Sequence, residues 1–523
     1  MSSTKNISET YSSKISSKIW GHRFISGQRG PEYALEFLNV LYGASYNLNA
    51  SKYKRTKAVE LRKFIFEGAK EGASRDTVTI DATKKQKLYE TLRDKDNVSV
   101  IREFLRNLEV PIVNHSGKLA DRSWYAKTLY PLHESLLFFE VRVKGKSVGI
   151  ERNFFARGGE LYYLMISFGT KNFPERKEFI ESRFKELLSK HNSIKRIVST
   201  ITDVLEDTEK EEYGYIQKQD EGGREELPHL PVNDHILYEE FAIELEQLLK
   251  LDIDVYEMFK LLTSLMCFQL LRYMYTMAKI DDNQEILMFF DCLDGQINQV
   301  LRLSSRTFQD NDVLIKEKFE DFFKNEFQEK IPNEDFLNEH LSLWKSESAV
   351  FFKHMGLSHL HATTKAAIKR TLAKCSSFED VNTNLFESVK DVVSDQLKKH
   401  QLNIIKVLVR DGGIGNYKAG SKYRYTLSDS LLQILVYTNV LPNESMEFSE
   451  FLNVLYKRYG IVVGERQAKM SKIYENSKLN IAYFHKNELA LREKLKSNGL
   501  LIEYSDATAM IRNPYEVREG VFV

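Results

Sequence analysis

The sequence predicts a mainly α-helical, multi-domain protein with smaller α+β parts and a winged-helix-like domain at its C-terminus. Three observations lead to this prediction: a length of 523 residues, helical periodicity along most of the chain, and a terminal helix followed by a glycine and two short strand patterns. At about 100 to 200 residues per domain, the length corresponds to three or four folding units that can each bury a core. A single small module is therefore excluded.

The composition is that of a globular protein with almost no overall charge. Lys and Arg number 75 and Asp and Glu 74, for a net charge of +1. This balance lacks the global positive field of a protein that coats nucleic acid or anionic lipid, so any DNA binding is confined to local basic patches. The three cysteines, Cys267, Cys292 and Cys375, are far apart and odd in number, which favours reduced thiols in the cytoplasm. No Cys-x-x-Cys pair occurs, which excludes a cysteine-based zinc site.

Residues 1–19 are predicted to be a flexible leader. This segment is rich in Ser, Thr and Lys and has no apolar run long enough for the core of a secretory signal peptide. The stretch most similar to a membrane span, residues 258–277, is interrupted by Lys260, Gln269 and Arg272, and its uncharged part is too short to cross about 30 Å of hydrocarbon. We therefore expect a buried helix there, no membrane association and a cytoplasmic location.

Residues 20–202 are predicted to form a helical N-terminal region that contains one β-hairpin. Pro31 suits the first turn of a helix that ends near Gly43. Over residues 136–150 apolar and polar residues alternate around a Lys-Gly-Lys turn, which predicts the hairpin. The apolar run at 160–168 fits either a helix or a strand, because periodicity cannot decide a run that short.

The middle of the chain divides into a charged segment and a helical segment. Residues 203–231 have high charge density, few aliphatic residues, and several Gly and Pro, which predicts an exposed linker or a long loop. Residues 232–377 are predicted to form a helical core domain with one buried strand. That strand is the continuous apolar run at 286–290, and Gly295 opens the next helical pattern.

Residues 378–523 are predicted to form the winged-helix-like domain. Its pattern begins with an amphipathic helix, continues with a strand and turn at 403–413, and includes a helix capped by Ser428 or Asp429. The last helix ends near Gly499 and is followed by two short strand patterns. Helix, glycine and terminal hairpin are the order of a winged helix and its wing.

Winged-helix units bind DNA through a helix in the major groove or serve as protein docking modules. Residues 378–523 hold 20 Lys and Arg against 18 Asp and Glu, which is a small positive balance for a DNA-binding domain. The sequence therefore leaves DNA contact and protein docking equally open. Five basic residues of the last helix and hairpin form the candidate phosphate-contacting face: Lys486, Arg492, Lys494, Lys496 and Arg512.

A second candidate site follows the predicted buried strand. Asp291 and Asp294 come directly after it, and Asn298, Arg302 and Ser304 follow at helical spacings. Strand ends of this kind often hold ligand groups, since the next helix offers free N–H groups to an anion. The two aspartates are the catalytic candidates and the other three residues the ligand-binding candidates. The alternative is a turn whose aspartates cap the helix. The spacing lacks the glycines and lysine of a P-loop, so nucleotide hydrolysis is not supported.

Three further sequence patterns do not predict a catalytic or metal-binding site. The histidines within 354–361 lack the carboxylates and spacing of a metal site, so we favour a packing or surface role and predict no metal or cofactor. The charged strand at 140–144 is similar to a nuclease Glu-x-Lys pattern, but its lysine comes two positions late. The heptapeptide EFLNVLY occurs at 36–42 and 450–456 with different flanks, and both copies are predicted to be amphipathic helices.

Several phrases of the sequence stand out together: GHRFISGQRGPEYALEFLNVLYG, RNFFARGGELYYLMIS, FFDCLDGQINQVLRLSS, and MEFSEFLNVLYKRYGIVVG with its SDATAMIRNPY hairpin. As a set they resemble poorly characterised proteins encoded in bacterial phage-defence islands beside methyltransferases and large ATPases. The resemblance spans most of the chain. It implies a cytoplasmic subunit that acts on foreign DNA together with other defence subunits, such as an ATPase or a methyltransferase.

The leading hypothesis is a non-catalytic DNA-sensing or adaptor subunit of a multiprotein antiphage defence system. It is motivated by the absence of catalytic motifs together with the winged-helix order at the C-terminus. One alternative is a divergent metal-dependent nuclease that uses Asp291 and Asp294. Another is a scaffold that binds only protein, which the near-neutral charge supports. Whether the chain is an enzyme stays open, with the balance against it.

Overall fold

The structure is a computed structural model, and it shows a mainly helical protein with a few short strands. The residues that it describes are 11–22, 24, 28–56, 58–68, 78–113, 118–120, 124, 127–137, 141–144, 147–150, 157–206, 210–215, 227–281, 284–358, 360–399, 401–416, 422–504 and 508–516.

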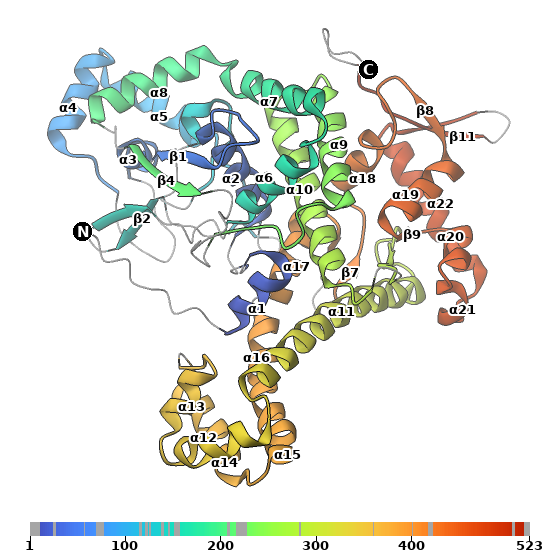
Figure 1. The fold of residues 1–523 in the computed structure, drawn as a ribbon. Helices are drawn as coiled ribbons and strands as arrows, with labels where there is room; N and C mark the ends of the chain where they lie inside the picture. The colour runs from blue at the N-terminus through green and yellow to red at the C-terminus, as the bar shows by residue number, and fades with distance from the viewer. Residues whose placement is uncertain are drawn as a thin grey trace.

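A body of helices and small sheets makes up most of the molecule, and a helical arm projects from it (Figure 1). One helix, α10 (Val255–Ala278), runs through the body and organises its core. It packs against α2 (Gly30–Gly43), α9 (Ile236–Lys250), α17 (Gln401–Asp411) and α18 (Asp429–Tyr437), which come from distant parts of the sequence. The N-terminal and C-terminal parts of the chain therefore share one core around α10.

Helix α10 confirms the buried helix predicted at 258–277. Its Leu and Phe side chains and all its Met side chains except Met277 are buried. Asp254 caps its first turn by accepting hydrogen bonds from the backbone N–H groups of Tyr256 (2.7 Å) and Glu257 (2.9 Å). Across the described ranges, no helix combines the length and the apolar character needed to span a membrane.

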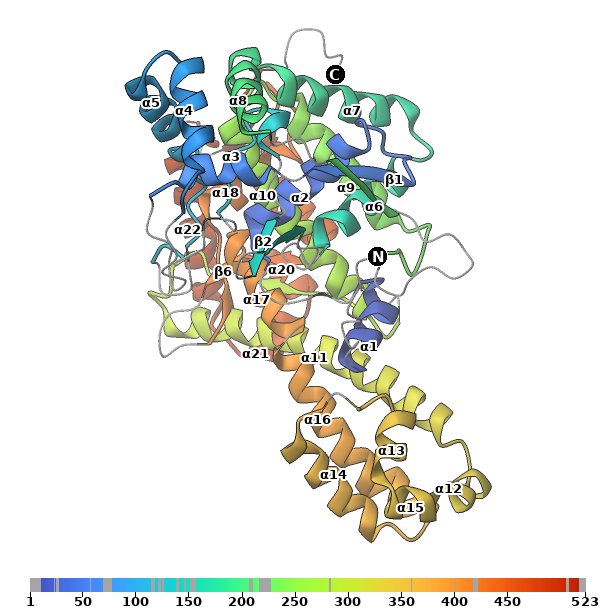
Figure 2. The same cartoon turned by 90° about the vertical axis from the view of Figure 1, so that its left-hand side faces the viewer.

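The N-terminal region is a group of helices with two small strand pairs (Figure 2). Strands β2 and β3 pair antiparallel, with Val141 opposite Ile150, which confirms the predicted hairpin. Besides α2, the elements are α1 (Tyr11–Trp20), β1 (Lys52–Thr56), α3 (Val59–Phe66), α4 (Ala82–Thr91), α5 (Lys95–Arg106), η2 (Glu134–Leu136), β2 (Val141–Lys144), β3 (Ser147–Ile150), α6 (Gly158–Gly169), α7 (Pro174–Ser189), α8 (Asn192–Leu205) and β4 (Lys210–Tyr215).

The apolar run at 160–168 is a helix, α6, and the strand alternative is excluded. α6 packs closely against α2 because Gly159 has no side chain at the crossing. A Cβ atom there would lie 2.6 Å from the backbone nitrogen of Phe37 and 2.6 Å from the carbonyl oxygen of Tyr33. The pair of glycines before the run is therefore a helix-packing feature.

Part of the predicted flexible leader is instead an ordered helix. Ile15, Ile19 and Trp20 of α1 are buried, and the Trp20 indole donates a hydrogen bond to the carbonyl of Met274 in α10 (3.0 Å). Apolar side chains spaced along one helical face dock this segment on the body, although Ser and Lys dominate its composition. Residues 1–10 lie outside the described residues.

The predicted linker contains a strand, so its assignment as a loop is wrong for residues 210–215. These residues form β4, which pairs antiparallel with β1 so that Thr56 lies opposite Lys210. A segment rich in charged residues can form a strand because backbone hydrogen bonds, which do not depend on side-chain type, hold the pair together. α8 extends to Leu205 within the same predicted linker, and residues 216–226 lie outside the described residues.

The arm is built by helices that leave the body along α11 (Asn298–Lys330) and return along α16 (Phe386–Lys399) (Figure 1). The rings of Phe323 and Phe386 stack between these two helices, with centroids 5.3 Å apart. Helices on both sides of the predicted boundary at residue 378 pack together in the arm. The remaining arm elements are α12 (Glu334–Ser346), α13 (Ser348–His354), α14 (Ala362–Lys374), α15 (Phe378–Asp380) and η3 (Val381–Leu385).

The described histidines near the end of the arm are not arranged to bind a metal ion. His354 packs against the ring of Trp344, with centroids 5.3 Å apart, and its Nε2 lies 2.8 Å from the carbonyl oxygen of Lys330. Within the described part of the chain, no three His, Cys, Asp or Glu side chains are placed to hold a metal ion. His359 lies outside the described residues.

The C-terminal unit surrounds a three-stranded antiparallel sheet in the order β10-β11-β8. A separate parallel pair, β5 and β9, joins this unit to the predicted buried strand at 286–290, of which Met288 and Phe289 are paired. In addition to α18, the elements are β5 (Met288–Phe289), β6 (Gly415–Asn416), β7 (Arg424–Tyr425), β8 (Ser445–Glu447), α19 (Phe448–Tyr459), β9 (Ile461–Val462), α20 (Glu465–Met470), α21 (Ile473–Ser477), α22 (Ile481–Ser497), β10 (Leu501–Glu503) and β11 (Ala509–Arg512).

The strand predicted within 403–413 is wrong, because residues 403–411 belong to helix α17, whereas the turn predicted after it is present at 412–413. Ile404, Ile405, Leu408 and Val409 are buried along one helical face. β-branched residues favour strands only weakly, and packing of this face on α10 overrides that preference.

Two predicted helix boundaries are confirmed. Ser428 caps α18, since its Oγ accepts a hydrogen bond from the backbone N–H of Leu431 (3.2 Å). α19 ends at Gly460, which has a φ of +69°. A Cβ atom on Gly460 would lie 1.9 Å from the carbonyl oxygen of Ile286, so only glycine permits the β5–β9 pairing at this helix end.

Candidate nucleic-acid interface

The turn after β5 buries the first of the two catalytic candidates. Asp291 is 0% exposed, and its Oδ2 forms an ion pair with Arg424 Nε at 3.1 Å. Its Oδ1 accepts a hydrogen bond from the backbone N–H of Leu293 at 3.0 Å. Burial raises the pKa of Asp291, against the opposing effect of the Arg424 charge. Oδ1 is therefore hydrogen-bonded, whereas Oδ2 is near the Arg424 charge but accepts no hydrogen bond from a described residue. The buried ion pair gives Asp291 a structural role.

The second aspartate faces solvent and joins two of the predicted sites. Both oxygens of Asp294 accept hydrogen bonds from Lys494 Nζ, at 2.9 and 2.8 Å. The capping alternative is wrong for both aspartates, because the N-cap of α11 is Ile297 and receives no side-chain hydrogen bond. Instead, the turn lies on the surface of α22. The strand end and the basic C-terminal helix, which are 200 residues apart, are one neighbourhood.

Asn487, which is not among the residues predicted from the sequence, holds α22 against this turn. Its side chain is fully buried and accepts a hydrogen bond from Cys292 N (2.9 Å). It also donates to the carbonyl oxygens of Phe290 (2.8 Å) and Val463 (3.1 Å). The signal in the sequence was an Asn in the apolar stripe of α22, three residues after Phe484. A polar residue in such a stripe requires internal hydrogen bonds.

The five predicted DNA-contacting cations are on one unit, but three of them are already paired. Glu503 accepts hydrogen bonds from both Arg492 (2.8 Å) and Lys496 (2.7 Å), and Lys494 is bound to Asp294. The bond to Glu503 raises the pKa of Lys496. A nucleic-acid phosphate would have to compete with these carboxylates. The other two cations, Lys486 and Arg512, are exposed.

The three ligand-binding candidates at the start of α11 do not form one site. Ser304 is buried and donates a hydrogen bond to the carbonyl oxygen of Tyr425 (2.9 Å), so it belongs to the core. Asn298 and Arg302 are exposed. Arg302 alone lines a cavity. Arg302 thus faces a cavity, whereas Ser304 points into the core, and ligand binding by Arg302 stays a prediction.

That cavity is the outer part of a groove between α11 and the start of α22, which we name the α11 groove. Its outer part has a volume of about 360 Å³ and its inner part about 220 Å³, and the two share Leu303, Arg306 and Ser477. The inner part extends along α11 as far as Leu314. The side chains that line the outer part are Gln299, Arg302, Leu303, Arg306, Ser477, Lys478, Leu479, Asn480 and Tyr483.

Three exposed cations converge on the α11 groove from two segments. Arg302 and Arg306 are one turn apart on α11, and Lys478 occupies a left-handed position between α21 and α22, with a φ of +53°. None of the three forms a salt bridge with any residue that the structure describes. Asp310 lies beyond Arg306, at the inner part of the groove. Arg306 nevertheless interacts electrostatically with Asp310, which counteracts the rise in the pKa of Asp310 that burial causes. The outer groove therefore carries three cations, of which Arg306 is partly balanced by Asp310.

The chemistry of the α11 groove suits an extended anion. Arginine side chains bind phosphate oxygens through paired N–H donors, and lysine adds a point charge. Tyr483 is half-buried in the wall and offers an aromatic face, and Gln299 adds an exposed amide. Cations beside an aromatic ring and amides are the combination found in nucleic-acid grooves.

Comparisons of the chain with protein-family models, with curated proteins and with solved structures find no match. The arrangement of Arg302, Arg306 and Lys478 is thus interpreted from the chemistry of the chain's own residues.

Proposed function

We propose that the chain is a non-catalytic nucleic-acid-binding adaptor that holds DNA phosphates in the α11 groove. The observation that carries the proposal is the convergence of Arg302, Arg306 and Lys478 on the outer part of this groove, where none of the three forms a salt bridge with a described residue. Phosphate neutralisation depends on clustered cations more than on total charge, so a chain with a net charge of +1 can bind DNA through such a patch.

The C-terminal unit supports the proposal through the order of its elements. If β9, α20 and α21 are treated as an insertion between α19 and α22, the order is helix α18, strand β8, helices α19 and α22, and strands β10 and β11. β11 pairs with both β10 and β8. This order supports a winged-helix-like unit in which α22 is the helix that approaches DNA. The inserted helices α20 and α21 lead to Lys478, so the insertion supplies one wall of the α11 groove.

The proposed biological setting is antiphage defence in the cytoplasm, together with an ATPase or a methyltransferase. This part of the proposal rests on the resemblance of the sequence phrases. It fits an adaptor that brings foreign DNA to a catalytic partner.

The double variant Arg302→Glu/Arg306→Glu reverses two charges of the α11 groove. We expect it to lower the affinity for a fluorescent 20-base-pair duplex by at least about tenfold. Each phosphate contact contributes about 0.9 to the slope of log affinity against log salt concentration, so the slope should fall by about 2. Fluorescence anisotropy between about 50 and 200 mM salt measures both quantities.

The matched control is Lys369→Glu/Arg370→Glu on α14, where both side chains are exposed on the arm. It changes the net charge by the same amount but should keep the affinity within about twofold. Equal losses in the two variants would show a general charge effect and contradict the α11 groove as the site. Binding that does not depend on salt would contradict phosphate contacts altogether.

A protein-binding scaffold is the second candidate function, and a specific observation favours it. Leu489 of α22 is 58% exposed and Tyr504 after β10 is 54% exposed, beside the cations that Glu503 neutralises. Exposed apolar side chains with neutralised charges suit a protein partner better than DNA. Failure of the parent chain to bind duplex at about 50 mM salt would favour this scaffold.

A further inference from the structure

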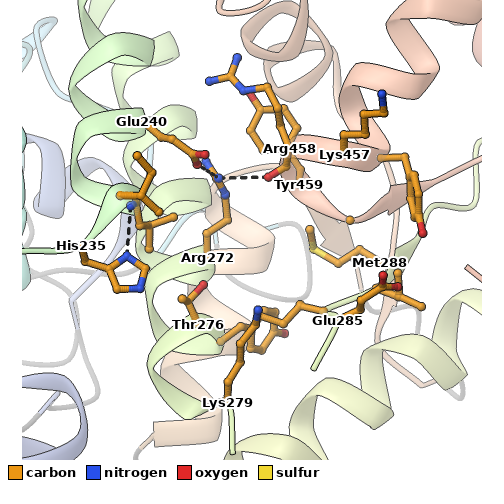
Figure 3. A pocket seen from close by; sticks show the side chains of 17 residues that line it. His235, Glu240, Arg272, Thr276, Lys279, Glu285, Met288, Lys457, Arg458 and Tyr459 are labelled. Atoms are coloured by element: carbon orange, nitrogen blue, oxygen red, sulfur yellow. Dashed lines mark hydrogen bonds and ion pairs between the residues drawn. The ribbon is translucent and has the colours of Figure 1, made fainter. Parts of the chain in front are cut away.

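A second cavity adjoins the inner part of the α11 groove, with which it shares Glu285 and Leu287, and has no role in the proposed adaptor function. It has a volume of about 480 Å³ and is enclosed by four segments that are distant in sequence (Figure 3). They are the first turn of α9, the last turns of α10, the segment that leads into β5, and the end of α19. We name it the α9–α10 pocket. Its size is in the range of small-molecule sites.

The centre of the α9–α10 pocket is a rigidly held arginine. Arg272 is only 7% exposed, and its guanidinium donates to Glu240 Oε2 at 2.6 Å and to Glu244 Oε1 at 3.0 Å. It also lies 4.6 Å from the ring centroid of Tyr459. Figure 3 shows the guanidinium between Glu240 and Tyr459. Such a guanidinium is preorganised, so a ligand would meet it without ordering a flexible side chain.

The carboxylates behind Arg272 do not leave a negative surface. Glu244 is buried and also accepts from Arg458 Nη2 at 3.2 Å, so two guanidiniums share this carboxylate. Arg272 and Arg458 together balance Glu240 and Glu244. The net charge of the pocket is therefore determined by the other charged residues, which lie at its rim.

The rim carries an excess of positive charge. Lys279 and Lys457 lie on opposite sides of the pocket (Figure 3), and neither forms a salt bridge with any described residue. The acid at the rim, Glu285, is hydrogen-bonded to the hydroxyl of Tyr456, and burial together with the Glu285 charge raises the pKa of that tyrosine. The rim thus holds two lysines against one glutamate, and this excess of one positive charge favours an anionic ligand.

The remaining lining is apolar and would cover the body of a small molecule. Leu237, Leu287 and Met288 line the pocket between the charged groups. We propose that the α9–α10 pocket binds a small phosphate ester, with its phosphate toward Lys279 and Lys457 and its organic part against these apolar side chains. Because the walls come from α9 and α10 on one side and from α19 on the other, the ligand ties the C-terminal unit to the central helices.

The test measures binding of AMP and of inorganic phosphate to the full chain by isothermal titration calorimetry. AMP should bind, and Lys279→Ala/Lys457→Ala should weaken it by at least about tenfold. The matched control, Lys171→Ala/Lys369→Ala, removes two exposed lysines elsewhere and should bind AMP as the parent does. Neither pocket lysine has an ion-pair partner among the described residues, so the pocket variant should unfold at the same temperature as the parent.

Three results would overturn the proposal. The first is no binding of AMP or phosphate up to about 10 mM. The second is a lysine variant that binds AMP as tightly as the parent. The third is equal affinity for phosphate and AMP, which would show that the apolar wall contributes nothing and that no ester is recognised. None of these results depends on whether the α11 groove binds DNA.

Discussion

Replacing Arg424 with methionine is expected to lower the free energy of unfolding by about 3–5 kcal/mol, because the Asp291 carboxylate is then left buried without its ionic partner. In the parent chain Arg424 is 3% exposed and Asp291 0% exposed, and their side chains lie 3.1 Å apart. Methionine fills a similar space but supplies no charge. Urea unfolding followed by circular dichroism measures the change.

The pH dependence of this loss identifies its cause. Burial already raises the pKa of Asp291 in the parent, and loss of the Arg424 charge raises it further. A carboxyl group with a raised pKa in the folded state stabilises the fold fully below its unfolded pKa, and this stability is lost as the pH rises through the folded pKa. The deficit of Arg424→Met should therefore be large at pH 7 and smaller at about pH 4.

A second variant separates charge from packing. Asp291→Asn/Arg424→Met keeps an oxygen that can accept from Leu293 N and removes both charges, so it should recover most of the stability. A single Arg424→Met variant as stable as the parent at pH 7 would contradict the buried ion pair. An equally unstable double variant would assign the loss to packing.

Replacing Asn487 with leucine is expected to lower the free energy of unfolding by about 2–4 kcal/mol. The substitution removes hydrogen bonds to Cys292 N, Phe290 O and Val463 O, and leaves these backbone groups buried. Because Asn487 fixes α22 beside the turn after β5, the variant should also bind DNA more weakly. Thermal unfolding and the duplex anisotropy assay measure the two effects.

The control for this prediction is Asn498→Leu at the end of the same helix. Asn498 is half-exposed, and its side-chain nitrogen donates to Asp429 Oδ1 at 3.0 Å, so a lost bond there can be replaced by water. The cost should stay below about 1 kcal/mol. Equal costs at positions 487 and 498 would contradict the role of Asn487 as an internal clamp.

The sequence correctly predicted those helices and helix ends that depend only on neighbouring residues. α10 follows from a long apolar segment whose charged residues lie within a helical pattern, and Gly460 and Ser428 act through their own backbone and hydroxyl groups. The heptapeptide EFLNVLY is helical in both α2 and α19. Its environment differs, since Glu36 is buried and accepts from Gly159 N (2.7 Å) whereas Glu450 is exposed. The heptapeptide sequence therefore determines that both copies are helical, but it does not determine which of their side chains are buried.

Tertiary contacts decided the elements that the sequence missed. The β-branched run of α17 is held as a helix by α10, and β4 pairs with a strand more than 150 residues earlier. The segment before Trp20 is ordered because its apolar face meets the body of the molecule. Neither the partner strand nor the docking surface is visible in a window of neighbouring residues.

In the candidate site, too, residues that depend on a local pattern were predicted and residues brought together by the fold were not. Arg302 was found because it follows a strand end, but Arg306 and Lys478 were missed because the α11 groove joins segments about 170 residues apart. The five cations of the last helix and hairpin were selected by their local density. Their carboxylate partners include Asp294, which the sequence places in another domain. A high local density of Lys and Arg predicts a basic segment. Which of these side chains form ion pairs depends on residues that are distant in sequence, so it is visible only in the fold.

The most direct test of the central claim places a photo-crosslinking phenylalanine derivative at Tyr483, in the wall of the α11 groove, and at Leu343, on the arm. The chain bound to labelled duplex should crosslink from position 483 and not from position 343. Arg302→Glu/Arg306→Glu should abolish the crosslink from position 483. A chain that binds the duplex but gives no crosslink from position 483 would contradict the α11 groove as the nucleic-acid site.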